Sequence, residues 1–255
     1  MKKTLLSVAG FDPTSGAGAS LDLRVFQHLG FHGMSVLTSL TAQNTEKVNG
    51  FHCLPHEFLK SQYEALRGDV FISGIKVGMV GCGENMPIIQ EILKDNLAVQ
   101  RVVDPVLKSS SGTWLIDQEA IPNYISSLKG NASLLTPNRE EAGMLSGMKV
   151  RTEEEMKKAA EKIYALSSIP CLITGGDLPK KSTNLLYDGK SFYHFKKEKL
   201  KKKVHGTGCC LSSSLLAFLV QGNSLEKACH LATEFTHKAI QNALQVGRGQ
   251  HIISL

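Results

Sequence analysis

The sequence predicts a three-layer α/β fold, with a central, mainly parallel sheet between two layers of helices. Apolar, β-branched segments alternate along the chain with segments whose apolar residues recur at helical spacing. Most of the strand-like segments are apolar nearly throughout, as in parallel strands that are buried on both faces. The 255 residues contain no long linker, repeat or break in composition, so we expect a single domain, residues 1–255.

The expected elements follow in order. The strand-like segments are residues 4–9, 34–41, 70–77, 99–104, 133–136 and 171–174. The helical patterns are residues 19–29, 55–66, 84–93, 152–166, 208–220 and 224–244. An antiparallel hairpin is expected over 184–187 and 191–195, because Asp188-Gly189 is a typical hairpin-turn dipeptide.

Helix boundaries are marked by local signals. Thr152 and Glu155 have the spacing of a capping box and predict a helix start. Gly222 is expected to end the helix before the last one. Asn223, with Glu226 three residues later, is expected to cap the last helix.

Composition excludes several classes of protein. Hydrophobic residues make up 42% of the chain, enough for a core, yet no apolar run reaches the ~18 residues of a membrane span. The N-terminal Lys2-Lys3 and the short apolar run after them imitate a signal peptide, but Asp12-Pro13 follows at once. We therefore interpret this run as the first strand and expect a soluble, cytoplasmic protein. The six cysteines have no C-x-x-C spacing, so we expect reduced thiols that pack as small apolar residues.

The net charge of +6 is concentrated in one segment. Residues 196–203 contain six lysines without the interleaved aromatic residues that stack on bases. This favours a solvated arm, or a basic rim near a phosphorylated substrate, over a nucleic-acid site. Two nucleotide motifs are also excluded: Asn184 replaces the first glycine of a Walker A loop ending at Gly189-Lys190-Ser191, and no G-x-G-x-x-G follows the first strand.

The strongest chemical signal is the run His205-Gly206-Thr207-Gly208-Cys209-Cys210, which leads directly into an apolar helix. Glycines at a helix start let backbone N–H groups converge on an anion, and the helix dipole adds roughly half a positive charge. Cys209 falls in the first turn, where the helix terminus is expected to lower the pKa of a thiol. The run therefore predicts an anion cradle with a base beside it; a buried thiol at a plain helix start is the alternative.

Four further clusters follow expected strands, where ligands of parallel sheets bind. They are the small-residue loop 10–18, the polar run 41–45, the strand end 104–106 and the segment 136–141. Gln43 can both donate and accept hydrogen bonds, which suits an aminopyrimidine edge. Asn138 and Glu141 lie three residues apart and can hold Mg²⁺ through its waters, or serve as an ordinary helix cap and a solvated side chain.

Together, these segments resemble the hydroxymethylpyrimidine/phosphomethylpyrimidine kinases of thiamine biosynthesis, within the ribokinase-like superfamily, over nearly the whole chain. The matching segments are Asp12-Pro13 with Gly16-Ala17-Gly18, Asp22-Leu23, residues 40–45, Lys76-Val77-Gly78-Met79, Asp104-Pro105-Val106, Thr136-Pro137-Asn138 with Glu141, and residues 205–209. The resemblance implies a ribokinase-like α/β/α domain, usually a homodimer. It also implies transfer of the ATP γ-phosphoryl group to a pyrimidine alcohol, and commonly a second transfer to the monophosphate.

The resemblance also implies roles for single residues. Gln43 would bind the pyrimidine edge. The residues expected to line the substrate pocket are Gly18, Asp22, Met79 and Val106. Asn138 and Glu141 would organise Mg²⁺ and its waters, and Thr174 would lie at the ATP site. The amides of Gly206, Thr207, Gly208 and Cys209 would hold the developing negative charge, with Cys209 as the base.

The chain departs from the family where relatives usually have lysines, at Ser110, Thr174 and Thr233. Lys108, Lys180 and Lys181 are near in sequence and are candidates to replace them. These losses raise doubt about the second phosphorylation and leave two other interpretations open. One is a pyridoxal, pyridoxine or pyridoxamine kinase, which Thr174 favours and Gln43 opposes. The other is a non-catalytic ligand-binding relative, which the intact Cys209 opposes.

Overall fold

A mixed sheet with parallel central strands forms the middle of the molecule. The computed structural model describes residues 2–109, 111–176 and 182–255. Within these residues the sheet has nine strands in the order β3-β2-β1-β4-β5-β6-β7-β8-β9. Neighbours from β2 to β7 pair in parallel, whereas β3, β8 and β9 pair antiparallel to their neighbours. The fold class is therefore as predicted.

The strand bounds are β1 Thr4–Phe11, β2 His32–Gln43, β3 Val48–Cys53, β4 Gly74–Val77, β5 Gln100–Val103, β6 Leu134–Leu135, β7 Cys171–Ile173, β8 Ser182–Tyr187 and β9 Phe192–Lys197, with β10 Val204–His205 and β11 His251–Ile252 as a separate pair. The α-helices are α1 Gly18–His28, α2 His56–Arg67, α3 Met86–Asp95, α4 Ile121–Ser127, α5 Arg139–Ser146, α6 Glu153–Ser167, α7 Thr207–Val220 and α8 Leu225–Gln241. Two 3-10 turns, Gly83–Asn85 and Gln118–Ala120, precede α3 and α4.

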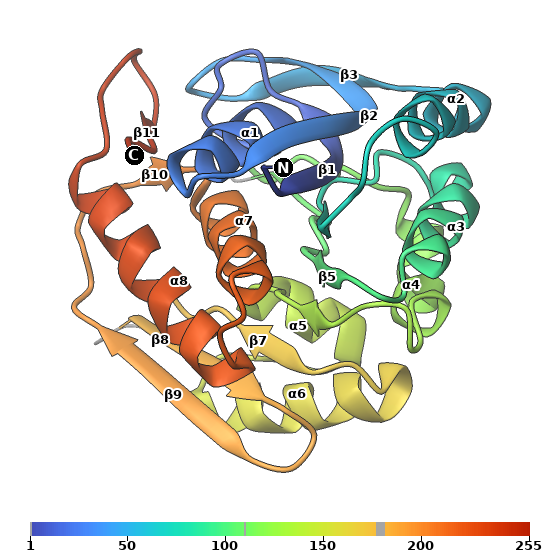
Figure 1. The fold of residues 1–255 in the computed structure, drawn as a ribbon. Helices are drawn as coiled ribbons and strands as arrows, with labels where there is room; N and C mark the ends of the chain where they lie inside the picture. Colours follow the sequence, from blue (N-terminus) through green and yellow to red (C-terminus); the bar gives the residue numbers. More distant parts are fainter. Residues whose placement is uncertain (1, 110, 177–181) are drawn as a thin grey trace.

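Consecutive residues of the buried strands face opposite layers of helices. Leu5 packs with the cluster that includes α1, α7 and α8, whereas Leu6 packs with the cluster that includes α2 to α6. The same alternation recurs at Val102 and Val103 on β5. Figure 1 shows these two groups of helices on the two sides of the sheet. Burial on both faces explains why the strands are apolar nearly throughout.

Local signals predicted several boundaries correctly. Thr152 and Glu155 form a reciprocal capping box at the start of α6. The hairpin β8–β9 turns at Asp188-Gly189, where Gly189 has φ +98°. Gly222 follows α7 with φ +93°, a backbone conformation that favours glycine.

Other boundaries differ from expectation for tertiary reasons. The strand expected at 70–77 begins only at Gly74, because the Val70 amide still closes the end of α2 through the carbonyl of Leu66. Ser224, rather than Asn223, caps α8 by accepting from the Lys227 amide. Asn223 instead donates its side-chain amide to the carbonyl of Phe218 at the end of α7. Strands β3, β10 and β11 and helices α4 and α5 were not predicted.

The expectation of six reduced cysteines is wrong for one pair. Cys53, at the end of β3, forms a disulfide with Cys82 in the loop after β4. The pairing depends on strand β3, which the sequence did not predict, and on Gly81, whose φ of +90° turns the loop toward Cys53. The free cysteines Cys171, Cys210 and Cys229 are buried, as small apolar residues are.

The candidate residues gather where the order of the sheet reverses. Strand β1 is flanked by β2 on one side and by β4 on the other, so the carboxyl ends of β1 and β4 border a topological switch point. The N-termini of α1 and α7 meet at this edge, since Gly206 approaches Gly16. This arrangement positions the loops that carry the site.

Candidate active site

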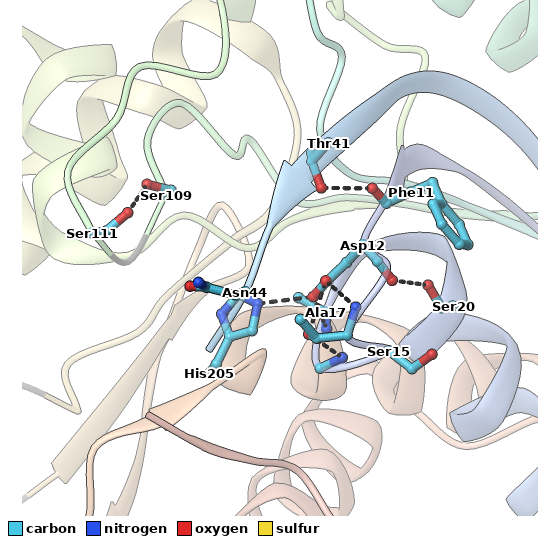
Figure 2. Close-up of polar contacts among 12 residues, drawn as sticks. Phe11, Asp12, Ser15, Ala17, Ser20, Thr41, Asn44, Ser109, Ser111 and His205 are labelled. Atoms are coloured by element: carbon cyan, nitrogen blue, oxygen red, sulfur yellow. Dashed lines mark hydrogen bonds and ion pairs between the residues drawn. The ribbon is translucent and has the colours of Figure 1, made fainter. Parts of the chain in front are cut away.

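Asp12 organises the loop between β1 and α1. Its carboxylate is 2% exposed and accepts from the amide and hydroxyl of Thr14 (both 2.8 Å) and from the Ala17 amide (2.9 Å). The same carboxylate lies 2.9 Å from Nε2 of His205 (Figure 2). Burial alone would raise the pKa of Asp12, but the hydrogen bonds from His205 and Thr14 lower it on balance. Asp12 is therefore ionised and joins this loop to the residue before the glycine run.

The glycine run opens α7 as the sequence predicts. Gly206 caps the helix with φ +85°, and a Cβ atom there would overlap the carbonyl oxygen of Gly16. Glycine is therefore required both by backbone conformation and by the close approach of the two loops. The first intrahelical bond joins the Cys210 amide to the Gly206 carbonyl, which leaves the amides of the preceding residues free for an anion.

Cys209 lies between this helix start and α1. The Gly18 amide donates a hydrogen bond to the Cys209 sulfur. Although the residue is partly exposed, desolvation of the thiol raises the pKa of Cys209 to about 12. The charge of Lys76 lowers this pKa, whereas the carboxylates of Asp22 and Asp104 raise it. The expectation of an acidic thiol is thus wrong, because burial raises the pKa of Cys209 more than Lys76 and the Gly18 backbone lower it.

Two buried carboxylates lie beside the helix start. Asp104 accepts from the hydroxyls of Ser212 (3.1 Å) and Thr136 (3.3 Å). Glu141 is 4% exposed and forms a reciprocal capping box with Asn138 at the start of α5. Burial, together with the charge of Asp104, raises the pKa of Glu141 well above its ordinary range, and burial also raises the pKa of Asp104. A bound cation would relieve this repulsion.

Magnesium fits these donors through its waters. Across the described ranges, no three His, Cys, Asp or Glu side chains gather as a metal cage. Mg²⁺ usually keeps several waters and uses one or two carboxylates with phosphate oxygens, so a site with Glu141 and the amide of Asn138 suits it. The Asn138–Glu141 pair forms the helix cap that one interpretation predicted, although Glu141 is buried rather than solvated, and the magnesium role stays a prediction.

A cavity of about 530 Å³ adjoins the helix start. Its lining includes the predicted residues Asn138, Glu141, Thr174, Thr207 and Gly208. The basic segment 196–203 also lines this cavity, through Lys197, Lys199, Lys202 and Lys203. The lysine run therefore forms a rim of this cavity rather than only a solvated arm.

Gln43 lies at a second, much smaller cavity. That cleft is about 10 Å³ and is lined by residues at the turn between β2 and β3, together with Ser111 and His205. Gln250 lines both cavities, and its amide donates to the Thr45 carbonyl (2.8 Å). Gln43 does not line the larger cavity, and its contact with a pyrimidine stays a prediction.

The remaining predicted substrate residues line neither cavity. Asp22 is fully buried in an ion pair with Lys76, and Met79 is 7% exposed beneath Gly10. Val106 is partly exposed next to Asp104. Their part in substrate binding stays a prediction.

Sequence reasoning assigned no role to Lys76, and Ser212 and Ser213 were missed. A lysine between Ile75 and Val77 in an apolar strand was the available signal, because buried lysines need a partner. The candidate replacements Lys180 and Lys181, and the departure at Ser110, fall outside the described residues. Thr174 and Thr233 line the larger cavity, and Thr233 accepts from the side chain of Asn184 (3.1 Å).

Comparison with known proteins decides the family. The family model described as phosphomethylpyrimidine kinase matches residues 12–254. This chain belongs to that kinase family. The match spans every loop described above, so the helix start, the buried carboxylates and the larger cavity are features of a phosphomethylpyrimidine-kinase fold.

Individual relatives agree with this assignment. The chain is 39% identical over 250 residues to the hydroxymethylpyrimidine/phosphomethylpyrimidine kinase of Aquifex aeolicus, covering 97% of this chain and 98% of that one. A solved phosphomethylpyrimidine kinase from Clostridium difficile is similar with TM-score 0.81 and 34% identity, covering 94% of this chain and 100% of that one. The pyridoxal kinase from Staphylococcus aureus in complex with AMP-PCP is similar with TM-score 0.90 and 31% identity, covering 99% and 93%. The ribokinase-like fold class is confirmed, and both vitamin kinases remain relevant to substrate choice.

Proposed function

We propose that this protein transfers the γ-phosphoryl group of ATP to the hydroxyl of 4-amino-5-hydroxymethyl-2-methylpyrimidine, and then phosphorylates the monophosphate. One observation carries the proposal: Thr207 and Gly208, in the first turn of α7, line the same 530 Å³ cavity as Glu141 and Asn138. Phosphoryl transfer needs positioning and charge stabilisation more than covalent chemistry, and this arrangement supplies both. Membership of the kinase family supports it.

ATP would occupy the larger cavity, which Thr174 and the lysine rim also line. Glu141 and Asn138 would hold Mg²⁺ through water, and the ion would neutralise charge on the phosphates. The amides of Thr207, Gly208 and Cys209 would donate to the oxygens of the transferred group. Similarity to a kinase solved with AMP-PCP supports this use of the cavity.

Cys209 would take the proton of the substrate hydroxyl. Its thiol first loses a proton to solvent; the thiolate then accepts the hydroxyl proton as the oxygen bonds to the γ-phosphorus and the bond to ADP breaks. Gly18 would hold the sulfur through its amide. Burial raises the pKa of this thiol to about 12, so positive charge beside it, from Lys76 and from Mg²⁺, would have to favour the thiolate.

Gln43 would recognise the pyrimidine edge, with Gly18, Asp22, Met79 and Val106 around the ring. The second transfer needs a cation for the existing phosphate. Lys108 lines the larger cavity, pairs with Glu140 at 2.6 Å and lies 4.2 Å above the ring of Trp114. Of the three candidate replacements for the missing lysines, Lys108 is the one that lies among the described residues.

Pyridoxal phosphorylation is the second candidate activity. Similarity to the S. aureus pyridoxal kinase and the threonine at position 174 favour it. Gln43, which suits an aminopyrimidine, favours the first candidate.

The test is ADP release with Mg·ATP and hydroxymethylpyrimidine, its monophosphate or pyridoxal, each with an EDTA control. We expect turnover of both pyrimidines that EDTA abolishes. Turnover of the free alcohol alone would refute the second transfer. Turnover of pyridoxal alone would establish the second candidate, and a folded protein inactive on all three would be a non-catalytic relative.

Three expectations stay predictions: the homodimer, which the family resemblance implies, the cytoplasmic location, which the N-terminal run suggests, and the absence of a nucleic-acid partner, which the composition of residues 196–203 suggests. Among the described residues, no helix has both the length and the apolar character needed to cross a membrane.

A further inference from the structure

A fully buried ion pair joins β4 to α1. Lys76 on β4 places its Nζ 2.8 Å and 3.0 Å from the two carboxylate oxygens of Asp22 on α1. Both side chains are 0% exposed. The hydroxyls of Ser7 and Ser213 each donate to Asp22 at 2.6 Å. Every oxygen of this carboxylate is thus engaged, and the ammonium is fixed in position.

Stability alone does not explain such a pair. Buried ion pairs are often replaced by apolar residues with no loss of stability, because desolvation offsets the attraction. The residues beside Lys76 in the strand, Ile75 and Val77, are apolar and fully buried. These two neighbours pack with the other layer of helices, whereas Lys76 faces Asp22 on α1, so packing against them does not explain the charge.

The pair instead connects the elements that carry the reaction. Ser213 comes from α7, the helix that begins at the glycine run, and Asp22 comes from α1, whose first residue Gly18 contacts the Cys209 sulfur. Ser213 lies four residues after Cys209 on α7, about one helical turn further on the same face, so the carboxylate that accepts from Ser213 and the ammonium bound to that carboxylate lie about one turn below the thiol. The charged groups that act on Cys209 are Lys76 from β4, Asp22 from α1 and Asp104 after β5. Among these, Lys76 carries the positive charge.

We propose that Lys76 is the fixed counter-ion for the Cys209 thiolate, and that Asp22 acts as a positioning residue that holds the ammonium beneath it. This inference rests on the proposed base role of Cys209. Asp22 accepts two hydrogen bonds from the ammonium and so holds it in place. A charge that is already in place requires no reorganisation when the thiol ionises.

The test measures thiolate formation directly, without kinase activity. The rate of iodoacetamide alkylation at Cys209, identified by peptide mass spectrometry, is followed from about pH 7 to 10.5. Because Lys76→Met alone would leave Asp22 unpaired, the main variant is the double substitution Lys76→Met with Asp22→Asn. We expect alkylation at a given pH to slow by about tenfold or more, which corresponds to at least one pKa unit.

A second variant keeps the proposal testable if the double variant does not fold. Asp22→Asn alone retains the cation and removes a carboxylate that opposes ionisation, so its alkylation should be faster than that of the wild type. Ser214→Ala is the control, because Ser214 is buried on α7 and its hydroxyl donates to the Leu211 carbonyl (3.0 Å) rather than to Asp22. It should leave the rate close to that of the wild type.

A folded double variant with an unchanged alkylation profile would overturn the proposal, as would an unchanged or slower profile for Asp22→Asn. Neither result depends on turnover. Failure of the proposed kinase activity would appear separately, as a wild-type protein that alkylates normally but releases no ADP.

Discussion

The start of α7 gives the sharpest prediction, through Gly206→Ala. Gly206 has φ +85°, and a Cβ atom there would overlap the Gly16 carbonyl and lie 2.8 Å from Cδ2 of Leu21. Gly222, at the other end of the same helix, has φ +93°, but a Cβ atom there would meet nothing within 4 Å. Gly222→Ala is therefore a matched control for backbone conformation without the steric clash.

The two substitutions differ by a defined amount. A left-handed alanine costs about 1–2 kcal/mol, and this cost is common to both variants. Forcing extra atoms into packed structure costs about 1–3 kcal/mol more, and only Gly206→Ala incurs it. The loop 12–18 must then move away from the helix start and displace the amides that would face the phosphate. Loss of one such donor lowers turnover about 10²–10³-fold.

Urea unfolding followed by circular dichroism gives the free energies, and ADP release gives the turnover. We expect Gly206→Ala to lose about 2–5 kcal/mol and most of its turnover. Gly222→Ala should lose about 1–2 kcal/mol and keep its turnover. Equal destabilisation of both variants, or full turnover in Gly206→Ala, would refute the inference that the two loops are held in close contact.

Four further predictions concern single groups. Cys209→Ala should lower turnover about 10²–10⁴-fold with little change in ATP affinity. Cys210→Ala, which replaces the buried cysteine next to it, should remain active, and similar turnover in the two variants would rule out the base role. Gln43→Leu should raise KM for the pyrimidine about tenfold or more with little change in kcat, because it leaves polar ring atoms unpaired; an unchanged KM would remove that contact from the account. Replacing Cys53 and Cys82 by serine opens a loop of 29 residues and should lower the free energy of unfolding by about 3–4 kcal/mol, and a reducing agent should destabilise only the wild type. Burial raises the pKa of Glu141 above 4.5, so its protonated form stabilises the fold at low pH, and this contribution is lost as the pH rises through the folded-state pKa. Glu141→Gln should therefore flatten the loss of stability with rising pH and abolish the rise in Tm that Mg²⁺ causes. The exposed Glu161→Gln should change neither the pH dependence nor the effect of Mg²⁺.

Features that depend on neighbours in sequence were predictable. The capping box of Thr152 and Glu155, the turn at Asp188-Gly189 and the glycine run before α7 each act over a few residues. The apolar strands predicted the parallel sheet because burial on both faces leaves a visible pattern.

Features that depend on segments distant in sequence were not predictable. The disulfide of Cys53 needs the edge strand β3, whose Asn49-Gly50 gives no strand signal. The partner of Lys76 lies 54 residues away at Asp22, so the sequence offered only an isolated charge in an apolar strand. The pKa of Cys209 was predicted in the wrong direction, because the helix terminus is local and readable whereas burial by the rest of the fold is not.

The central claim is that the helix start and Cys209 transfer a phosphoryl group to a pyrimidine alcohol. Phosphorus NMR of hydroxymethylpyrimidine incubated with Mg·ATP and the purified protein tests it most directly. We predict a pyrimidine monophosphate signal that is replaced by a diphosphate in the wild type, and neither signal at equal times with Cys209→Ala. A folded wild-type protein that forms no phosphorylated pyrimidine, or a Cys209→Ala variant that forms it at the wild-type rate, would contradict the account.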